Sequence, residues 1–156
     1  MKKVVKFGGS SLADQHQFEK VYQIIKGDST RHYVVPSAPG KRFKKDTKVT
    51  DLLYKAYRHC KKDDFEEIFD QIKQRYFDIQ KALNISVDLE SEFTIIEENF
   101  KKDMGLDYAA SRGEYLNGKL LAAYLGFEFI DAKEIIFIDE NGNYDEAKTD
   151  PVLTKR

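Results

Sequence analysis

A strand, a helix and a second strand follow one another near the start of the chain, and this order constrains the fold more than any other feature. Residues 4–7 form a short apolar run that predicts a buried strand. Apolar residues then recur at helical spacing from Phe18 to Ile25, and Gly27 is placed to end that helix. Residues 32–35 predict a second strand. Two strands and a helix within about 35 residues are typical of a βαβ unit with parallel strands.

Each of these strands is followed by a loop of small residues. Gly8–Ser11 follows the first strand, and Ser37–Gly40 follows the second. Because parallel strands end at the same edge of a sheet, where ligands usually bind, we expect the two loops to line one crevice. Glycine lets a backbone approach a ligand closely, and Lys6 adds a mobile positive charge for phosphate oxygens. By themselves, however, both loops are weak evidence, because most such sequences are plain turns.

The remainder of the chain is expected to be mostly helical. Apolar stripes predict helices at about 50–60, 65–83, 89–100 and 108–125, with Thr50 or Asp51 capping the first and Gly126 ending the last. Residues 127–130 and 135–138 predict strands, with a hairpin turn at 140–143, and the polar tail 145–156 shows no periodicity. The sequence therefore predicts one α/β unit with a helical insertion at about residues 60–105.

Composition excludes several classes of protein. The formal net charge of −1 lacks the basic excess of a nucleic-acid binder. Cys60 is the single cysteine and the three histidines are scattered, so neither a disulfide framework nor a zinc cluster is expected. No uncharged apolar run approaches the ~20 residues that span a bilayer, and Lys6 interrupts the N-terminal apolar run. We expect a soluble cytoplasmic protein without nucleic-acid or membrane partners.

Two further segments have both a plain and a functional interpretation. The basic run 41–48 is either a solvated loop or a flexible lid over an anionic substrate. Glu114, near the start of the helix predicted at 108–125, is either an exposed helical residue or a carboxylate that grips an ammonium group. In the second case Arg112 and Asn117 are its expected companions.

Four blocks in this order resemble the aspartokinases, which are members of the amino-acid kinase family. The blocks are Lys6–Ser11, Val34–Gly40 with Val49–Leu53 after it, Ser111–Ala122, and Phe129–Ala132. The resemblance runs from the first residue to about Asp150. It implies the N-terminal lobe of a parallel-sheet sandwich of the amino-acid kinase, or carbamate kinase-like, type.

The resemblance also implies a reaction, in which ATP with Mg²⁺ phosphorylates the side-chain carboxylate of L-aspartate in lysine, threonine and methionine biosynthesis. Lys6 would neutralise charge on the transferring phosphoryl group, and the backbone of Gly8, Gly9 and Ser10 would cradle it. Ser37, Thr50 and Glu114 would hold the substrate, with Glu114 on its α-ammonium group. Such transfer needs mainly positioning and charge neutralisation.

Family members continue into a nucleotide-binding half and ACT regulatory domains. Residues 1–156 are therefore expected to be the N-terminal, substrate-binding part, with little turnover alone and a sheet face through which copies could associate. The family's later arginine in the aspartate site has no clear match in Glu140–Lys148. Two alternatives remain open: a family member acting on glutamate, carbamate or a nucleotide, and a non-catalytic interaction module built on the helices of residues 65–100.

Overall fold

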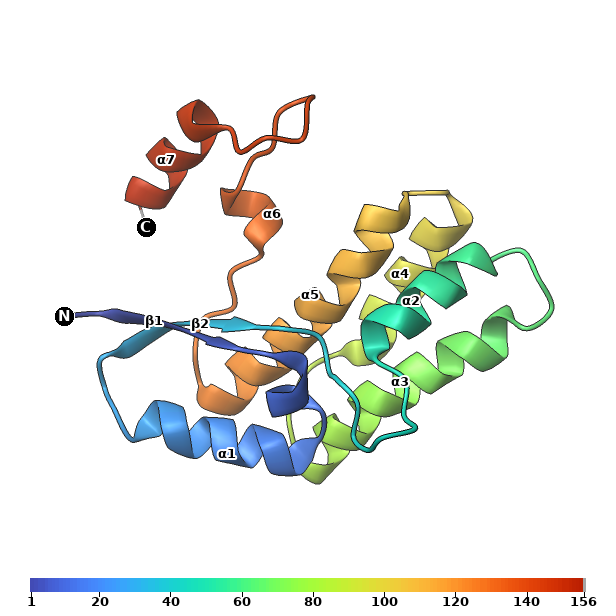
Figure 1. Cartoon of the computed structure of the whole chain (residues 1–156), viewed down its shortest axis with the longest axis horizontal. Coiled ribbons are helices and arrows are strands. Elements are labelled where there is room, and N and C mark those ends of the chain that lie inside the picture. The colour runs from blue at the N-terminus through green and yellow to red at the C-terminus, as the bar shows by residue number, and fades with distance from the viewer. Residues whose placement is uncertain (156) are drawn as a thin grey trace.

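Two parallel strands and a crossover helix open the fold, as the sequence predicts. The computed structural model describes residues 1–155. Strand β1 (Lys3–Phe7) pairs in parallel with β2 (Arg31–Pro36), so that Phe7 lies beside Pro36. The short 3₁₀ helix η1 (Gly9–Leu12) and the helix α1 (Gln15–Lys26) connect them (Figure 1). Asp14 accepts a hydrogen bond from the N–H of Gln17 and begins α1, and Gly27 ends it.

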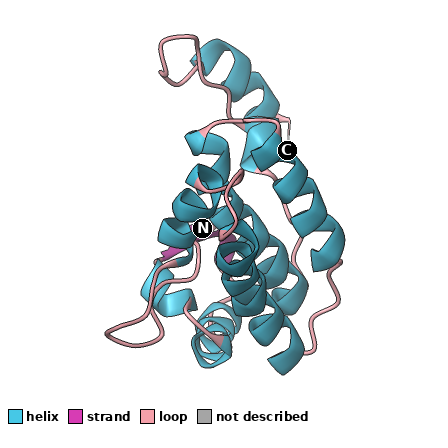
Figure 2. Cartoon of the chain, turned by 90° about the vertical axis from the view of Figure 1, so that its right-hand side faces the viewer, coloured by secondary structure: helices cyan, strands magenta, loops and turns pink. Residues whose placement is uncertain are grey.

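Helices make up most of the chain after β2, and the only sheet in the described part of the chain is the N-terminal pair (Figure 2). The four long helices are α2 (Val49–Arg58), α3 (Phe65–Ala82), α4 (Leu89–Lys101) and α5 (Leu106–Leu125). Aromatic rings fill the space between them: Phe69 packs edge-on to Phe93 and Phe100, with ring centroids 5.9 and 6.0 Å apart. All three rings are buried, so the stripes of residues 65–100 form core and do not offer a partner surface.

The starts of two helices differ from the sequence prediction. Helix α2 begins at Val49, and neither Thr50 nor Asp51 caps it. Val49 is fully buried and its N–H donates to the carbonyl of Pro39 at 3.1 Å, so the loop before the helix supplies the missing partner. Helix α5 begins at Leu106, which places Glu114 in the middle of the helix and not near its start.

The C-terminal segment also differs from the prediction, because the two strands expected at 127–130 and 135–138 do not form. Asp131 instead accepts a hydrogen bond from the N–H of Lys133 and begins the short helix α6 (Ala132–Ile135). Only one antiparallel bridge, between Ile138 and Tyr144, remains of the predicted hairpin. An extended segment without a neighbouring strand leaves its backbone groups unpaired, which disfavours a strand here.

The polar tail is helical and not irregular. Asp145 accepts a hydrogen bond from the N–H of Lys148, and α7 (Glu146–Thr154) follows. An N-cap acid followed by Glu146 is a recognisable helix start that the lack of apolar periodicity concealed. Figure 1 shows α6 and α7 set apart from the body that the other helices form.

The two faces of the sheet have different surroundings. Phe7 and Val34 pack against the hydrophobic core. Val4, Tyr33 and Val35 project from the opposite face, where 69%, 48% and 47% of their surfaces are exposed. We call this second surface the open face of the sheet. Among the described residues, no helix is long and apolar enough to cross a membrane.

Candidate active site

The loops Gly8–Ser11 and Ser37–Gly40, which we call the two glycine loops, meet at the carboxyl ends of the strands, as expected from the parallel pairing. The N–H of Ser37 donates to the carbonyl of Phe7 at 2.9 Å, and the N–H of Gly40 donates to the carbonyl of Gly9 at 2.8 Å. The contact is too close for side chains, because a Cβ on Gly40 would lie 2.6 Å from the carbonyl carbon of Gly9. A Cβ on Gly9 would lie 2.9 Å from the carbonyl oxygen of Ala38. Glycine at both positions therefore permits the loops to touch.

A cavity of about 480 Å³ lies where these loops meet α2 and α5. Its lining residues are Gly9, Ser10, Ser37, Ala38, Pro39, Gly40, Lys41, Lys48, Thr50 and Glu114. The cavity thus brings together five residues that the sequence selected from four separate segments: Gly9, Ser10, Ser37, Thr50 and Glu114. Lys6 and Gly8 are not among its lining residues.

Helix α5 places Glu114 in the cavity by packing directly against the second loop. A Cβ on Gly113 would lie 2.6 Å from the Cβ of Ala38, so only glycine allows this approach. The N–H of Ala38 donates to Oε1 of Glu114 at 3.3 Å. One helical turn later, the buried Asn117 donates from Nδ2 to the carbonyl of Ser37 at 2.7 Å. Glu114 is therefore tied to the loop that it faces.

The two companions expected for Glu114 have different places. Asn117 fixes the backbone of Ser37 and acts on the cavity through that loop. Arg112 does not line the cavity, and its guanidinium lies over the rings of Tyr108 and Tyr115, at 4.6 and 4.5 Å from their centroids. The pairing of Arg112 with these rings accounts for its position on α5.

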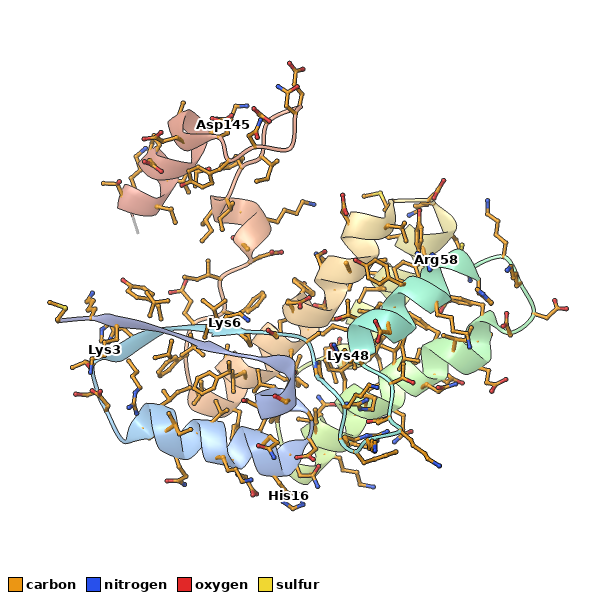
Figure 3. The ribbon with its side chains drawn as sticks, viewed as in Figure 1. Lys3, Lys6, His16, Lys48, Arg58 and Asp145 are labelled. Atoms are coloured by element: carbon orange, nitrogen blue, oxygen red, sulfur yellow. The ribbon has the colours of Figure 1, made fainter. Side chains whose placement is uncertain are left out.

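Lys6 and Gly8 precede the cavity on the N-terminal strand and its turn. Lys6 is exposed on β1 and alternates with Phe7, so it projects on the open face of the sheet. Figure 3 labels Lys6 on β1, upstream of the turn that leads into η1. Gly8 has φ −75°, and a Cβ there would meet nothing within 4 Å. The fold itself therefore does not require glycine at position 8.

The basic loop, residues 41–48, is anchored and does not hang free as the lid interpretation assumed. Arg42 donates to both carboxylate oxygens of Asp46, at 2.8 and 3.0 Å. Arg75, a buried residue of α3, lies 3.2 Å from the same carboxylate. The hydrogen bond from Arg42, with the charge of Arg75, holds the pKa of Asp46 well below its ordinary value. Burial lowers the pKa of Arg75.

Lys41 and Lys48, at the two ends of this loop, line the cavity but were not selected from the sequence. The dense basic run was the available signal, yet its pattern did not distinguish these two lysines from their neighbours. With them, the cavity contains two ammonium groups, one carboxylate and the hydroxyls of Ser10, Ser37 and Thr50. Such a set can bind a small molecule that carries charges of both signs. Among the described residues, no group of three His, Cys, Asp or Glu side chains could hold a metal ion.

Comparison with known proteins gives the family. The family model described as "Amino acid kinase family" matches residues 1–154. Aspartokinase 3 of Bacillus subtilis is 37% identical over 140 residues, which covers 85% of this chain and 31% of that protein. The crystal structure of Clostridium acetobutylicum aspartate kinase matches at 50% identity with a TM-score of 0.93, over 100% of this chain and 36% of that one.

A more distant structure shares the fold. Escherichia coli aspartokinase III in complex with aspartate and ADP superposes with a TM-score of 0.81 at 20% identity, over 100% of this chain and 37% of that one. The chain thus spans about a third of the length of the relatives it matches. The parallel pair, the helices and the match over residues 1–154 agree, and the chain belongs to the amino acid kinase family.

Proposed function

We propose that residues 1–156 form the N-terminal, substrate-binding part of an enzyme that transfers the γ-phosphoryl group of ATP to the side-chain carboxylate of L-aspartate. The observation that carries this proposal is the shared cavity, in which two glycine loops, Thr50 and Glu114 meet. A zwitterionic amino acid fits a lining that has both carboxylate and ammonium groups. The names of the relatives, Aspartokinase 3 and aspartate kinase, make L-aspartate the amino acid to test first.

The phosphoryl group belongs, in this proposal, at the N-terminal turn. The backbone of Gly8, Gly9 and Ser10 would approach its oxygens, and Lys6 would neutralise the charge that develops during transfer. Gly8 supports this role, because neither its φ nor its packing requires glycine. Mg²⁺ would arrive bound to ATP, as a part of that substrate.

The amino acid belongs on the other side of the cavity. Glu114 would accept hydrogen bonds from the α-ammonium group, while Ser37 and Thr50 would line the site with hydroxyls. Aspartate and ADP are both bound in the Escherichia coli structure whose fold this chain shares. The cytoplasmic location expected from the sequence remains part of the proposal.

The first test is L-aspartate binding to this chain, measured by isothermal titration calorimetry. Glu114→Gln keeps the shape of the side chain but removes the charge, and we expect about tenfold weaker binding because a charge-assisted hydrogen bond is lost. Glu98→Gln, an exposed change on α4, is the matched control and should bind as the parent does. Tighter binding of L-glutamate than of L-aspartate would favour the other substrate class, and equal binding by Glu114→Gln would contradict the assigned role.

We also propose that, when no nucleotide is bound, a second copy of the chain packs on the open face of the sheet, where it would cover Lys6. Val4, Tyr33 and Val35 leave an apolar strand surface exposed there, which promotes association. Light scattering between micromolar and millimolar concentrations should show the mean mass rising, and Val35→Lys should reduce that rise. A mass that stays at the monomer value throughout would end this proposal.

A further inference from the structure

The lysines at the two ends of the basic loop are the ones that face the cavity. Lys41 directly follows Gly40, which is bonded to the first glycine loop, and Lys48 directly precedes Val49, whose N–H is bonded to Pro39. Lys44 and Lys45, in the middle of the loop, are not lining residues. Figure 3 labels Lys48 where the loop meets the start of α2.

The charges of these two lysines are not neutralised by the loop's own acid. Asp46 is engaged by both Arg42 and Arg75, at 2.8 and 3.2 Å. Within residues 1–155, neither Lys41 nor Lys48 forms an ion pair. The cavity therefore holds an excess of one positive charge over the single carboxylate of Glu114.

Arg75 fixes the backbone beside each lysine. From its buried position on α3 it donates to the carbonyl of Gly40 at 2.6 Å and to the carbonyl of Thr47 at 3.0 Å. These are the residues immediately before Lys41 and Lys48. A third bond, to the carbonyl of Ala13 at 3.2 Å, joins the same guanidinium to the residue that follows η1. One side chain thus sets the positions of both lysines relative to the glycine loops.

We propose that Lys41 and Lys48 bind carboxylate groups of the substrate and that Arg75 is their positioning residue. The identity of the substrate rests on the proposed function. L-Aspartate carries two carboxylates and one ammonium group, and the cavity offers two ammonium groups and one carboxylate, so the charges are complementary.

The test compares two ligands, L-aspartate and succinate, which has the same two carboxylates but no ammonium group. Calorimetric titration of Lys41→Gln and of Lys48→Gln should each show about tenfold weaker binding of both ligands. Lys45→Gln, on the same loop but outside the cavity, should bind both as the parent does. Glu114→Gln should weaken L-aspartate alone, because succinate has no group for that carboxylate to hold.

The positioning role has a separate readout. Arg75→Lys keeps the charge but cannot reach three carbonyls, so it should weaken both ligands. Lys48→Gln added to Arg75→Lys should then weaken binding by less than its effect in the parent, because the lysine is already displaced. If Arg75 only stabilised the fold, the two substitutions would weaken binding independently, and their fold-changes would multiply.

The outcomes separate this inference from the proposed function. If L-aspartate binds in a Glu114-dependent way and both lysine variants match the parent, the inference is wrong and the function stands. If succinate binding depends on the lysines, L-aspartate binds no more tightly than succinate, and Glu114→Gln changes the binding of neither, the inference holds and L-aspartate is not the substrate. If neither ligand binds the parent chain, both are overturned.

Discussion

Replacing Gly40 by alanine is expected to destabilise the chain by about 3 kcal/mol, the upper end of the range for a forced contact in a packed site. The added Cβ would lie 2.6 Å from the carbonyl carbon of Gly9, 2.8 Å from its oxygen and 2.8 Å from the N–H nitrogen of Ser10. All three are backbone atoms, so no side chain can rotate away, and the two loops must separate. Urea unfolding followed by circular dichroism measures the change in free energy.

Gly8→Ala provides the matched control, since it adds the same methyl group to the loop that Gly40 contacts, one residue before Gly9. Nothing lies within 4 Å of a Cβ at position 8, and its φ of −75° suits alanine, so the free energy of unfolding should stay within ~0.5 kcal/mol of the parent. Equal stability of the Gly40 and Gly8 variants would show that the loops do not make the described contact. The cavity between the loops would then lose its geometric basis.

The N-terminal βαβ unit and the long helices could be predicted because their signals are local and periodic. Phe65, Phe69 and Ile72 recur at helical spacing in α3 and are all buried. Gly126 adopts φ +70° and ends α5, as a glycine after the last apolar residue indicates. The convergence of the two glycine loops followed from the parallel direction of the strands alone.

The C-terminal strands could not be judged from pattern, because an apolar run is a strand only if a neighbouring strand accepts its hydrogen bonds. The ring of Phe129 instead packs at 5.6 Å from that of Tyr115 on α5, and Asp131 begins a helix. The ring of Phe129 thus finds a partner, whereas the backbone of residues 127–130 has no neighbouring strand in the described part of the chain. Tertiary contacts of this kind override local propensity.

The places of Lys41, Lys48 and Arg75 could not be predicted from the sequence, for a related reason. A helical pattern places an arginine on the solvent side of its helix. Arg75 is buried nonetheless, because Asp46 and three backbone carbonyls from distant segments surround its guanidinium. Such a position depends on contacts with residues up to 62 positions away. The same contacts place Lys41 and Lys48, and not Lys44 or Lys45, at the cavity.

Arg75→Met is the second change with a large expected effect, a loss of about 3 kcal/mol in the free energy of unfolding. Methionine fills much of the same space but leaves the carbonyls of Ala13, Gly40 and Thr47 without their donor. Urea unfolding at neutral pH measures the loss. Arg42→Met is the control: its guanidinium is more exposed, and Asp46 keeps Arg75, so that change should cost less than ~1 kcal/mol.

The pH dependence of the stability difference between the parent and Arg75→Met tests how much of the lost free energy of unfolding comes from the ion pair with Asp46. A carboxyl whose pKa is lowered by folding contributes stability above its unfolded pKa of ~3.9, and the contribution is lost as the pH falls through the lower folded value. In Arg75→Met, Asp46 loses one of its two cations, so its pKa moves back toward the ordinary value. The unfolded state is the same in both proteins, so the gap should be constant from pH 7 to about pH 4. It should narrow only as the pH falls through the folded pKa of Asp46 in the variant, which the hydrogen bond from Arg42 still holds below its ordinary value. A gap that begins to narrow above pH 2 would assign part of the effect to Asp46, and a gap below ~1 kcal/mol at pH 7 would contradict the anchoring of the loop by Arg75.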